Sequence, residues 1–305
     1  LSSVLVLICM ALWLAQNAIT NRTSYRLVSG KGSRPVETHL SGGSLAAAWG
    51  WVALVLVVSI GIPYFSIIAS SLIKLRGYGL APGNFTLEHY AELFTTDRSL
   101  GAIGNSIFLA IASACICSVL GTVVVMAVRR GKGRLKKIVE GASMLPEMLP
   151  AIVLVIGIML FWNAIYDVLP LYNTMGIMVL AYVVLYLPYT VQYVTSSFTQ
   201  INDNLIQAGR TFGGSPWYVF RRITLPMIVP GILTGWMMIF IIAFRELVTA
   251  SLIAPPNVLV VSTYINREFE QGSVSLGMAM AVLCVAITTT TLLILNAVTS
   301  RKKAS

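Results

Sequence analysis

The feature that most constrains this chain is a series of apolar segments, each long enough to cross the hydrocarbon core of a membrane. A helix needs about 20 apolar residues to do so. The chain is 57% hydrophobic and only 10% charged, whereas soluble domains carry about 25% charged residues. We therefore expect an all-α fold, a polytopic membrane helical bundle. The segments expected to span the membrane are about 1–19, 46–73, 102–128, 139–163, 175–198, 227–253 and 275–298.

The basic residues are concentrated in alternate loops. Of the 21 Lys and Arg residues, 16 lie in four segments: 20–45, 129–137, 199–226 and 299–305. Short loops rich in Lys and Arg remain on the cytoplasmic side of a membrane. We therefore expect a bacterial inner-membrane protein whose N-terminus lies outside and whose C-terminus is cytoplasmic. The net charge of +10 is then a signal of topology, and we expect no nucleic-acid partner.

Residues that bind metals or perform catalysis are scarce. The two histidines, His39 and His89, lack metal-ligand spacing, and there is no C-x-x-C pair. The phosphate-binding motif GxxxxGK[ST] is also absent from the sequence. We therefore expect no metal, no cofactor and no catalytic residue. The cysteines all lie in apolar segments, where a packing role is expected: Cys9, Cys115, Cys117 and Cys284.

The stretch QAGRTFGGSPWYVFRRITLP (207–226) is a polar, sharply punctuated interruption between two apolar segments. Ser215 followed by Pro216 is a strong helix start, because Ser is a good N-cap and Pro suits the first helical position. Gly213 and Gly214 permit a sharp turn just before it. The sequence therefore predicts two short helices joined at a glycine elbow, the second ending at Leu225-Pro226.

The second of these helices is expected to be amphipathic. At 100° per residue, Val219, Phe220 and Ile223 fall on one side with Pro216, while Trp217 and Thr224 lie at its edge. The other side holds Tyr218, Arg221 and Arg222. Two interpretations remain open at this point. The helix could lie on the inner leaflet with its arginines near anionic lipid, or it could dock in a groove of a cytoplasmic partner.

The spacing in this loop resembles the EAA loop of binding-protein-dependent ABC importer permeases, E-A-A-x3-G-x9-I-x-L-P. Here Gln207-Ala208-Gly209 is followed after three residues by Gly213, and after nine more by Ile223-x-Leu225-Pro226. Gln207 replaces the Glu and Gly209 replaces the second Ala, so the role of that Glu does not carry over. The likeness extends over roughly residues 100–298.

The resemblance implies a six-span type I ABC permease core, here with one preceding helix. It implies that the loop forms coupling helices held in a cleft of a separate cytoplasmic ABC ATPase dimer, where ATP is hydrolysed. A periplasmic solute-binding protein and a second permease unit are the other implied partners, and alternating access is the implied mechanism. The residues that it assigns to coupling are Gln207, Ala208, Gly209, Gly213, Ser215, Pro216, Trp217, Phe220, Arg221, Leu225 and Pro226.

Three charged residues lie in apolar segments: Glu147 in LPEMLP, and Arg245 and Glu246 in FRELVTASLIAPP. Charges inside a membrane are costly and are functional candidates by default. They could line or gate the translocation path, or be paired inside the bundle and fix its packing. Glu147, between Pro146 and Pro150, could also belong to a broken helix of an ion-coupled secondary transporter, which is the alternative from a different class.

The stretches FRELVTASLIAPP (244–256) and FEQGSVSLGMAMAV (269–282) resemble the ferric-iron branch of these permeases, which often fuses two six-span units in one chain. This resemblance implies ferric iron as the solute, although the branches for polyamines, thiamine, sulfate or phosphonates share the loop.

The expected organisation is an orphan helix (1–19) that ends a preceding unit, a cytoplasmic linker (20–45), a first span with its external loop (46–99), the permease core (100–298) with coupling loop 199–226, and a basic tail (299–305).

The external loop carries FTLEHYAELF (85–94), which predicts a short helix with Thr86 as its cap and Glu88 in its first turn. This helix could simply close the loop, or it could contact an external partner.

Overall fold

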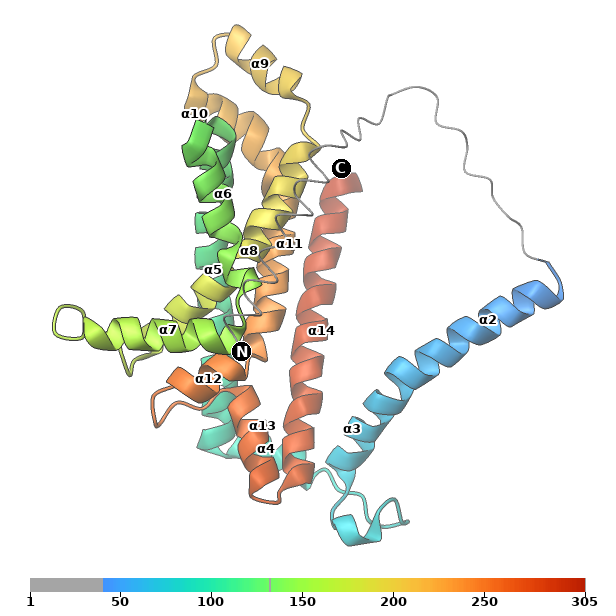
Figure 1. Ribbon diagram of the computed structural model, residues 1–305. Helices are drawn as coiled ribbons and strands as arrows, with labels where there is room; N and C mark the ends of the chain where they lie inside the picture. Colours follow the sequence, from blue (N-terminus) through green and yellow to red (C-terminus); the bar gives the residue numbers. More distant parts are fainter. Residues whose placement is uncertain (1–40, 132, 305) are drawn as a thin grey trace. The chain divides into compact units, whose positions relative to one another are not determined.

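The computed structural model describes residues 41–131 and 133–304 of the chain (Figure 1). These residues form two compact units, the first ending at Thr86 and the second beginning at Leu87. Helices dominate both units, and the isolated bridge between Ile73 and Phe85 is the one β feature among the described residues. The predicted all-α membrane fold is therefore confirmed. The expected span 1–19 lies outside the described residues.

The first unit contains one long apolar helix. It consists of α2 (Gly43–Leu56), a π-helical turn η1 (Val57–Gly61) and α3 (Ile62–Leu72), which together make a 30-residue candidate span. A short 3-10 turn, η2 (Arg76–Tyr78), follows it. Asn84 closes this turn, because its Nδ2 donates to the carbonyl oxygens of Leu75 and Gly79 at 2.7 and 2.8 Å.

Three long helices form the centre of the second unit: α5 (Asp97–Arg130), α8 (Met175–Thr199) and α11 (Leu225–Phe244), and each packs along the other two. Small residues permit this close approach, as is usual between membrane helices. Thr190 of α8 lies between Gly121 of α5 and Gly235 of α11. A Cβ added to Gly121 would lie 2.6 Å from Thr190 Cγ2, and one added to Gly235 would lie 3.2 Å from Thr190 Cα.

The predicted span 139–163 is not one helix. Helix α6 (Gly133–Met148) packs against α5 and α8, and α7 (Ala151–Ala164) then leaves it at an angle of 110°, as Figure 1 shows. Pro146 lies inside α6 without ending it, whereas Pro150 is the N-cap of α7. The residue before a proline is disfavoured in the α region, so the chain breaks at Leu149.

The span predicted at 227–253 ends earlier than expected. Helix α11 ends at Phe244, and a separate short helix, α12 (Val248–Ile253), packs against α7 and α8. Helix α13 (Val261–Glu270) follows and packs against α14 (Val274–Ala304). Helix α4 (Glu88–Thr95) packs against α5 and α14. Its N-cap is Leu87, so the prediction that Thr86 caps this helix was wrong.

Five described helices are long and apolar enough to cross a membrane, and α6 with α7 makes a sixth if the broken pair counts as one span. This agrees with the expected six-span core. The short helices α9 (Asp203–Thr211) and α10 (Pro216–Val219) lie at the same end of the second unit as the C-terminus (Figure 1). Helices α4, α12 and α13 lie at the opposite end of this unit (Figure 1). We call these three helices the far layer.

Candidate functional site

The elbow loop, residues 199–226, begins with a helix that is capped at both ends. Asn202 is the N-cap of α9, and its Oδ1 accepts a hydrogen bond from the Asn204 backbone N–H at 3.0 Å. At the other end, Gly213 has a φ of +82°. Its N–H donates to the Arg210 carbonyl, and the N–H of Gly214 donates to the Gly209 carbonyl, both at 3.0 Å. This is a Schellman motif, which terminates a helix and fixes the direction of the chain beyond it.

The second helix starts where the sequence predicts. Ser215 is the N-cap of α10, its Oγ accepts a hydrogen bond from the Tyr218 N–H at 3.2 Å, and Pro216 occupies the first turn. The two short helices and the glycine elbow between them are therefore present as expected. Their geometry depends on local turn chemistry rather than on burial.

A small apolar contact holds the two arms of the elbow together. Val219 of α10 is buried. A Cβ on Gly209 would lie 2.6 Å from Ile223 Cδ1 and 3.3 Å from Val219 Cγ2. A glycine at this position therefore lets α9 approach the second arm more closely than an alanine allows. Gln207 and Ala208 lie exposed on the same helix, and Gln207 is in mid-helix, where it cannot act as a cap.

The second arm of the elbow does not end at Leu225-Pro226, contrary to prediction. A π-helical turn, η3 (Phe220–Thr224), connects α10 directly to α11, and the whole of Pro216–Phe244 is one 29-residue helix. Pro226 follows η3 almost directly, so the widened π turn comes just before the residue that has no N–H to donate. The second arm of the elbow is therefore continuous with a candidate membrane span.

The outer surface of the elbow is aromatic and basic. Phe212, at its tip, is 92% exposed, and Tyr218 is 56% exposed. Arg210, Arg221 and Arg222 are also exposed. Phe212 was not among the predicted site residues, since no periodicity marks it. The available signal was its position directly before the elbow glycine, where a large apolar side chain cannot reach the bundle.

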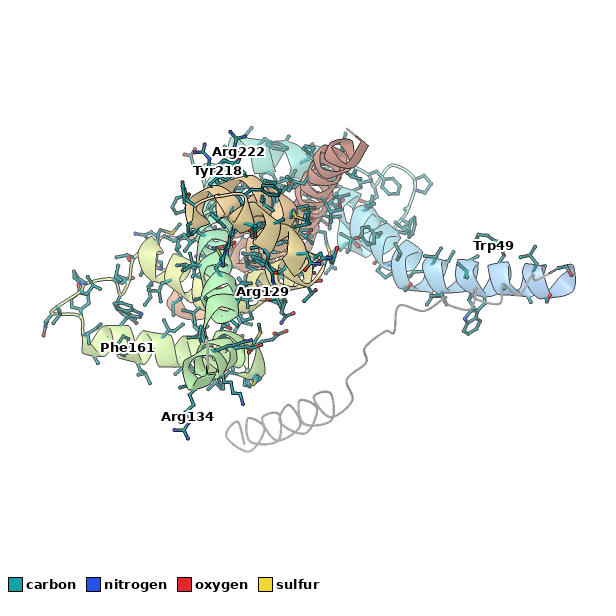
Figure 2. All side chains as sticks on the ribbon, turned by 90° about the horizontal axis from the view of Figure 1, so that it is seen from above. Trp49, Arg129, Arg134, Phe161, Tyr218 and Arg222 are labelled. Atoms are coloured by element: carbon teal, nitrogen blue, oxygen red, sulfur yellow. The ribbon has the colours of Figure 1, made fainter. Side chains whose placement is uncertain are left out.

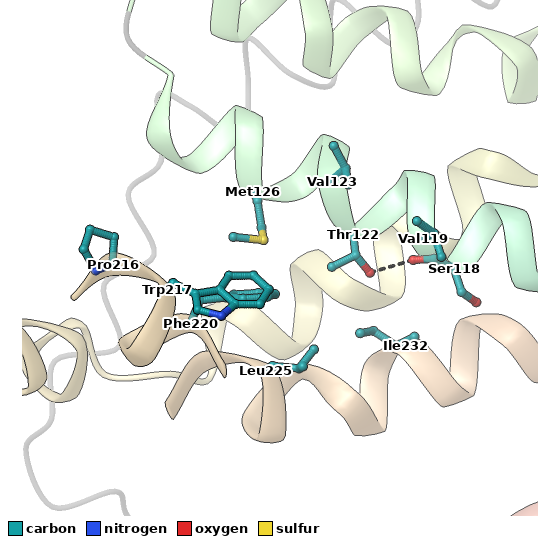
Figure 3. A pocket seen from close by; sticks show the side chains of 10 residues that line it. All are labelled: Ser118, Val119, Thr122, Val123, Met126, Pro216, Trp217, Phe220, Leu225 and Ile232. Carbon is teal, nitrogen blue, oxygen red and sulfur yellow. Dashed lines mark hydrogen bonds between the residues drawn. The ribbon is translucent and has the colours of Figure 1, made fainter. Parts of the chain in front are cut away.

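Trp217 and Phe220 face in a different direction from Tyr218. Their rings lie 5.6 Å apart and line a groove of about 650 Å³ with Met126 of α5 and Leu225 of α11, as Figure 3 shows. The π turn brings Phe220 and Leu225, five residues apart, onto the same face. We call this the α5–α10 groove. Its full lining is Ser118, Val119, Thr122, Val123, Met126, Pro216, Trp217, Phe220, Leu225 and Ile232.

Arg129 ties the end of α5 to the end of α8. Its guanidinium lies 4.9 Å from the centre of the Phe198 ring, and its Nη2 donates to the Phe198 carbonyl at 3.3 Å. A cation at a helix C-terminus is favourable, since the unpaired carbonyls carry negative partial charge. In Figure 2, Arg129 lies among the helices, whereas Arg134 projects outward from α6.

The three charged residues predicted for the path do not come together. Glu147 is exposed near the end of α6, and its Oε2 accepts a hydrogen bond from Gln192 Nε2 of α8. Arg245 is not inside a span but follows the last residue of α11 and is exposed. Glu246 accepts hydrogen bonds from the backbone N–H groups of Thr249 and Ala250, at 2.9 and 3.3 Å. Glu246 therefore caps α12, next to Arg245 but away from Glu147.

Among the residues that the structure describes, no group of three or more His, Cys, Asp or Glu side chains is arranged to hold a metal ion.

A family model matches most of the second unit. Residues 118–305 match the family model described as "Binding-protein-dependent transport system inner membrane component". The chain is 29% identical over 261 residues to the Fe(3+)-transport system permease protein FbpB 2 of Haemophilus influenzae, a match that covers 84% of this chain and 48% of that protein. The chain thus spans about half the length of that relative.

A second relative is shorter. The spermidine/putrescine transport system permease protein PotC of Haemophilus influenzae is 26% identical over 193 residues, which cover 63% of this chain and 73% of that protein. Among solved structures, a bacterial ABC transporter involved in the import of alginate superimposes with a TM-score of 0.68 and 16% identity, covering 84% of this chain and 95% of that chain. At that identity the superposition shows a shared fold.

Proposed function

Because the chain belongs to the family of inner-membrane components of binding-protein-dependent transport systems, we propose that it is a membrane-spanning permease subunit of an ATP-driven importer for ferric iron. In this proposal a separate cytoplasmic ATPase dimer hydrolyses ATP, a periplasmic protein delivers the solute, and a second permease unit completes the pathway. The C-terminus and the elbow loop lie on the cytoplasmic side.

The observation that carries the proposal is the construction of the elbow loop. A surface that passes force must be stiff, exposed and connected to what it moves. The elbow is stiff because both arms are capped and packed on each other through Gly209 and Val219. It is exposed at Phe212 and Tyr218, and it is connected because α10 runs into α11 through η3. Exposed aromatic and arginine side chains are the residue types enriched at interface hot spots.

The alternative interpretation of the elbow, a helix on the lipid surface, is less consistent with this geometry. An interfacial helix buries its apolar side in the membrane. Here Val219 is buried, and a Cβ on Gly209 of the first arm would lie 3.3 Å from Val219 Cγ2, so this apolar side chain is covered by protein. Phe212 is on a different arm from Tyr218, so one flat surface would not receive both.

The cytoplasmic placement of the elbow is supported by the gathering of basic residues. The 129–137 segment, the elbow and the C-terminal helix end lie at one end of the second unit in Figure 1, and these segments hold most of the basic residues of that unit. Among the described residues of this unit, the far layer has only Arg98, Arg245 and Arg267 near it. This asymmetry is the one that fixes orientation in multi-pass membrane proteins.

Iron is proposed as the solute from two lines of support. The FRELVTASLIAPP and FEQGSVSLGMAMAV stretches resemble the ferric-iron branch, and the FbpB 2 protein is similar over 84% of the chain while being about twice as long. That length ratio suits a relative in which two units are fused. Polyamine transport is the nearest alternative, since PotC is 26% identical, and thiamine, sulfate and phosphonates follow.

An ion-coupled secondary transporter is the remaining alternative. The break between α6 and α7 at Pro150 is a feature that such transporters use to form sites. Glu147 is next to this break, but its carboxylate is engaged by Gln192. Such a transporter is driven by an ion gradient, so it has no ATPase for a rigid cytoplasmic elbow to bind.

The test uses the intact permease in nanodiscs, together with the ATPase and the solute-binding protein encoded beside it. ATP hydrolysis is measured with the binding protein empty, loaded with Fe(III), or loaded with spermidine. We expect the ATPase to co-purify with the permease and the Fe(III)-loaded protein alone to stimulate hydrolysis. Co-purification without stimulation by iron would keep the importer and discard the solute. Failure of the ATPase to bind would overturn the function proposed for the elbow.

A further inference from the structure

Two grooves run between the central helices at the elbow end, and their linings differ in polarity. The α5–α10 groove, described above, is mostly apolar. The other, which we call the α8–α11 groove, has a volume of about 490 Å³. Its lining residues are Tyr193, Ser196, Ser197, Gln200, Ile201, Pro226, Met227, Pro230, Gly231 and Thr234. Both grooves are bordered by candidate membrane spans.

The floor of the α8–α11 groove is fixed by a close contact of two backbones. A Cβ added to Gly231 of α11 would lie 2.1 Å from Ser197 Oγ and 2.7 Å from the Tyr193 carbonyl oxygen. The glycine therefore brings α11 directly against the polar face of α8. Ser197 Oγ therefore lies directly against α11, and the other polar side chains of the groove lie along the same contact.

Most of these polar side chains have no hydrogen-bond partner among the residues that the structure describes. This holds for the hydroxyl groups of Tyr193, Ser196 and Ser197 and for the side-chain amide of Gln200. They occupy one face over the last two turns of α8. A polar group facing hydrocarbon without a partner costs several kcal/mol, so this face requires water or polar groups of another molecule.

The hydroxyl groups of the α5–α10 groove are satisfied within their own helix. Ser118 Oγ donates to the Ala114 carbonyl at 2.8 Å, and Thr122 Oγ1 donates to the Ser118 carbonyl at 2.7 Å. Hydroxyls bonded in this way are tolerated in lipid. Val119 and Val123, on the same face, are 65% and 57% exposed. The two grooves therefore differ in the medium that they can face.

We propose that the α8–α11 groove is one wall of the water-filled route by which the solute reaches the cytoplasm, and that the α5–α10 groove faces lipid. The proposal rests on the proposed transport function and adds the side of the helix bundle along which the solute moves. None of the ten residues that line the α8–α11 groove is charged. The lining offers phenol, hydroxyl and amide groups, which suit a hydrated or hydroxyl-bearing solute.

An uncharged lining is consistent with an exit route. A conducting surface must bind its solute strongly enough to admit it and weakly enough to let it leave. Carboxylates facing a ferric ion here would hold it tightly, because hard oxygen anions are strong ligands of hard cations. Glu246, which follows α11, is instead engaged in capping α12.

The experiment measures the accessibility of single cysteines in the assembled transporter. Cys9, Cys115, Cys117 and Cys284 are first replaced by alanine, and uptake by this background is confirmed. Ser196→Cys and Thr234→Cys then probe the α8–α11 groove, and Val119→Cys and Val123→Cys are the matched controls in the other groove. A charged, membrane-impermeant methanethiosulfonate is applied to inside-out vesicles, and total thiol is counted after denaturation in detergent.

We expect the two groove cysteines to react about tenfold faster than the valine-site controls, because thiol reactivity requires the hydrated thiolate. Modification at Ser196→Cys should also block uptake. Equal rates in both grooves, or faster reaction at the valine sites, would overturn the proposal. Binding of the ATPase is measured on the same vesicles. If the ATPase binds but the groove stays unreactive, the route proposal fails and the importer proposal stands. If the groove cysteines react but no ATPase binds, the importer proposal fails and the groove remains a water-filled face of the transporter.

Discussion

The two ends of the second unit are built in opposite ways. At the elbow end, large side chains are left exposed, including Phe212, Trp217 and Tyr218. The far layer is instead tied together across elements. Asn105 Nδ2 of α5 donates to the Leu259 carbonyl at 2.9 Å, and the N–H of Val261 donates to Ser106 Oγ at 2.8 Å.

The far layer also buries polar side chains, whereas the arginines of the elbow are exposed. Tyr264 and Glu268 of α13 are only 3% and 5% exposed. Glu246 caps α12 through its carboxylate while its backbone carbonyl accepts a hydrogen bond from Ser262 Oγ. The far layer is thus held by hydrogen bonds between different helices, whereas the elbow is held by caps within its own two arms.

The strongest test of this comparison introduces the same backbone strain in the elbow and in the far layer. Gly213 in the elbow and Gly272 after α13 both have positive φ, at +82° and +86°, and a Cβ at either would meet nothing within 4 Å. Valine at either position costs about 1–2 kcal/mol locally, because left-handed backbone disfavours a side chain. We expect Gly213→Val, and more strongly Gly213→Pro, to lower uptake about tenfold or more while ATP hydrolysis continues, because a misaligned coupling element loses productive geometry.

The control for that prediction is Gly272→Val, which should leave uptake per ATP unchanged at equal expression. Uptake and hydrolysis are measured together in proteoliposomes. Normal coupling in Gly213→Val, or equal uncoupling by both variants, would contradict the assignment of the elbow.

The next effect concerns the rigidity of the far layer. Glu246→Ala removes the acceptor of the Thr249 and Ala250 N–H groups, and we expect a loss of about 2 kcal/mol in the free energy of unfolding, as for a charged capping group. Glu246→Gln keeps an acceptor oxygen and should lose less. Thermal unfolding of the purified permease measures both. An unchanged melting temperature in Glu246→Ala would show that α12 does not depend on this cap.

A smaller and more specific effect is expected at the elbow tip. Phe212→Ala should weaken ATPase binding about tenfold, as loss of an aromatic anchor often does, and should leave the melting temperature unchanged because the side chain packs against nothing. Phe269→Ala, on α13 in the far layer, is the matched control and should leave ATPase affinity unchanged. Affinity is measured by titrating labelled ATPase. Wild-type affinity in Phe212→Ala would remove Phe212 from the interface.

The smallest effect is a pH dependence of the far layer. Burial, aided by the negative charges of Glu268 and Glu92, raises the pKa of Tyr264 to about 12 from its ordinary value of 10.0. The folded state thus binds this proton more tightly than the unfolded state, so its contribution to stability is complete below pH 10 and is lost as pH rises toward 12. Tyr264→Phe should lose less stability over that interval in alkaline melting curves, and an identical loss in both proteins would contradict this.

The elbow could be predicted from sequence because its geometry is local. Gly213, Ser215 and Pro216 each adopt the conformation that their own chemistry favours, whatever surrounds them. The helix breaks were harder. Pro146, Pro150 and Pro226 have similar sequence signals, yet only Pro150 marks a break, because neighbouring helices decide whether a freed carbonyl is tolerated.

The two grooves were invisible to sequence analysis for a related reason. Hydropathy averages over a whole span, so it does not separate Thr122, whose hydroxyl is bonded within α5, from Ser196, whose hydroxyl is not. The same averaging placed Arg245 inside a span, although α11 ends just before it. Packing and hydrogen bonding between helices supply the missing information.

The central claim is that the elbow is the surface to which the ATPase binds, and photo-crosslinking tests it most directly. Benzoylphenylalanine is introduced in place of Phe212 at the elbow tip or, as the control, in place of Phe269 in the far layer, in the intact transporter in membranes. We predict a permease–ATPase adduct from position 212 and none from position 269. An ATPase adduct from position 269, or none from position 212 while the ATPase remains bound, would contradict the account.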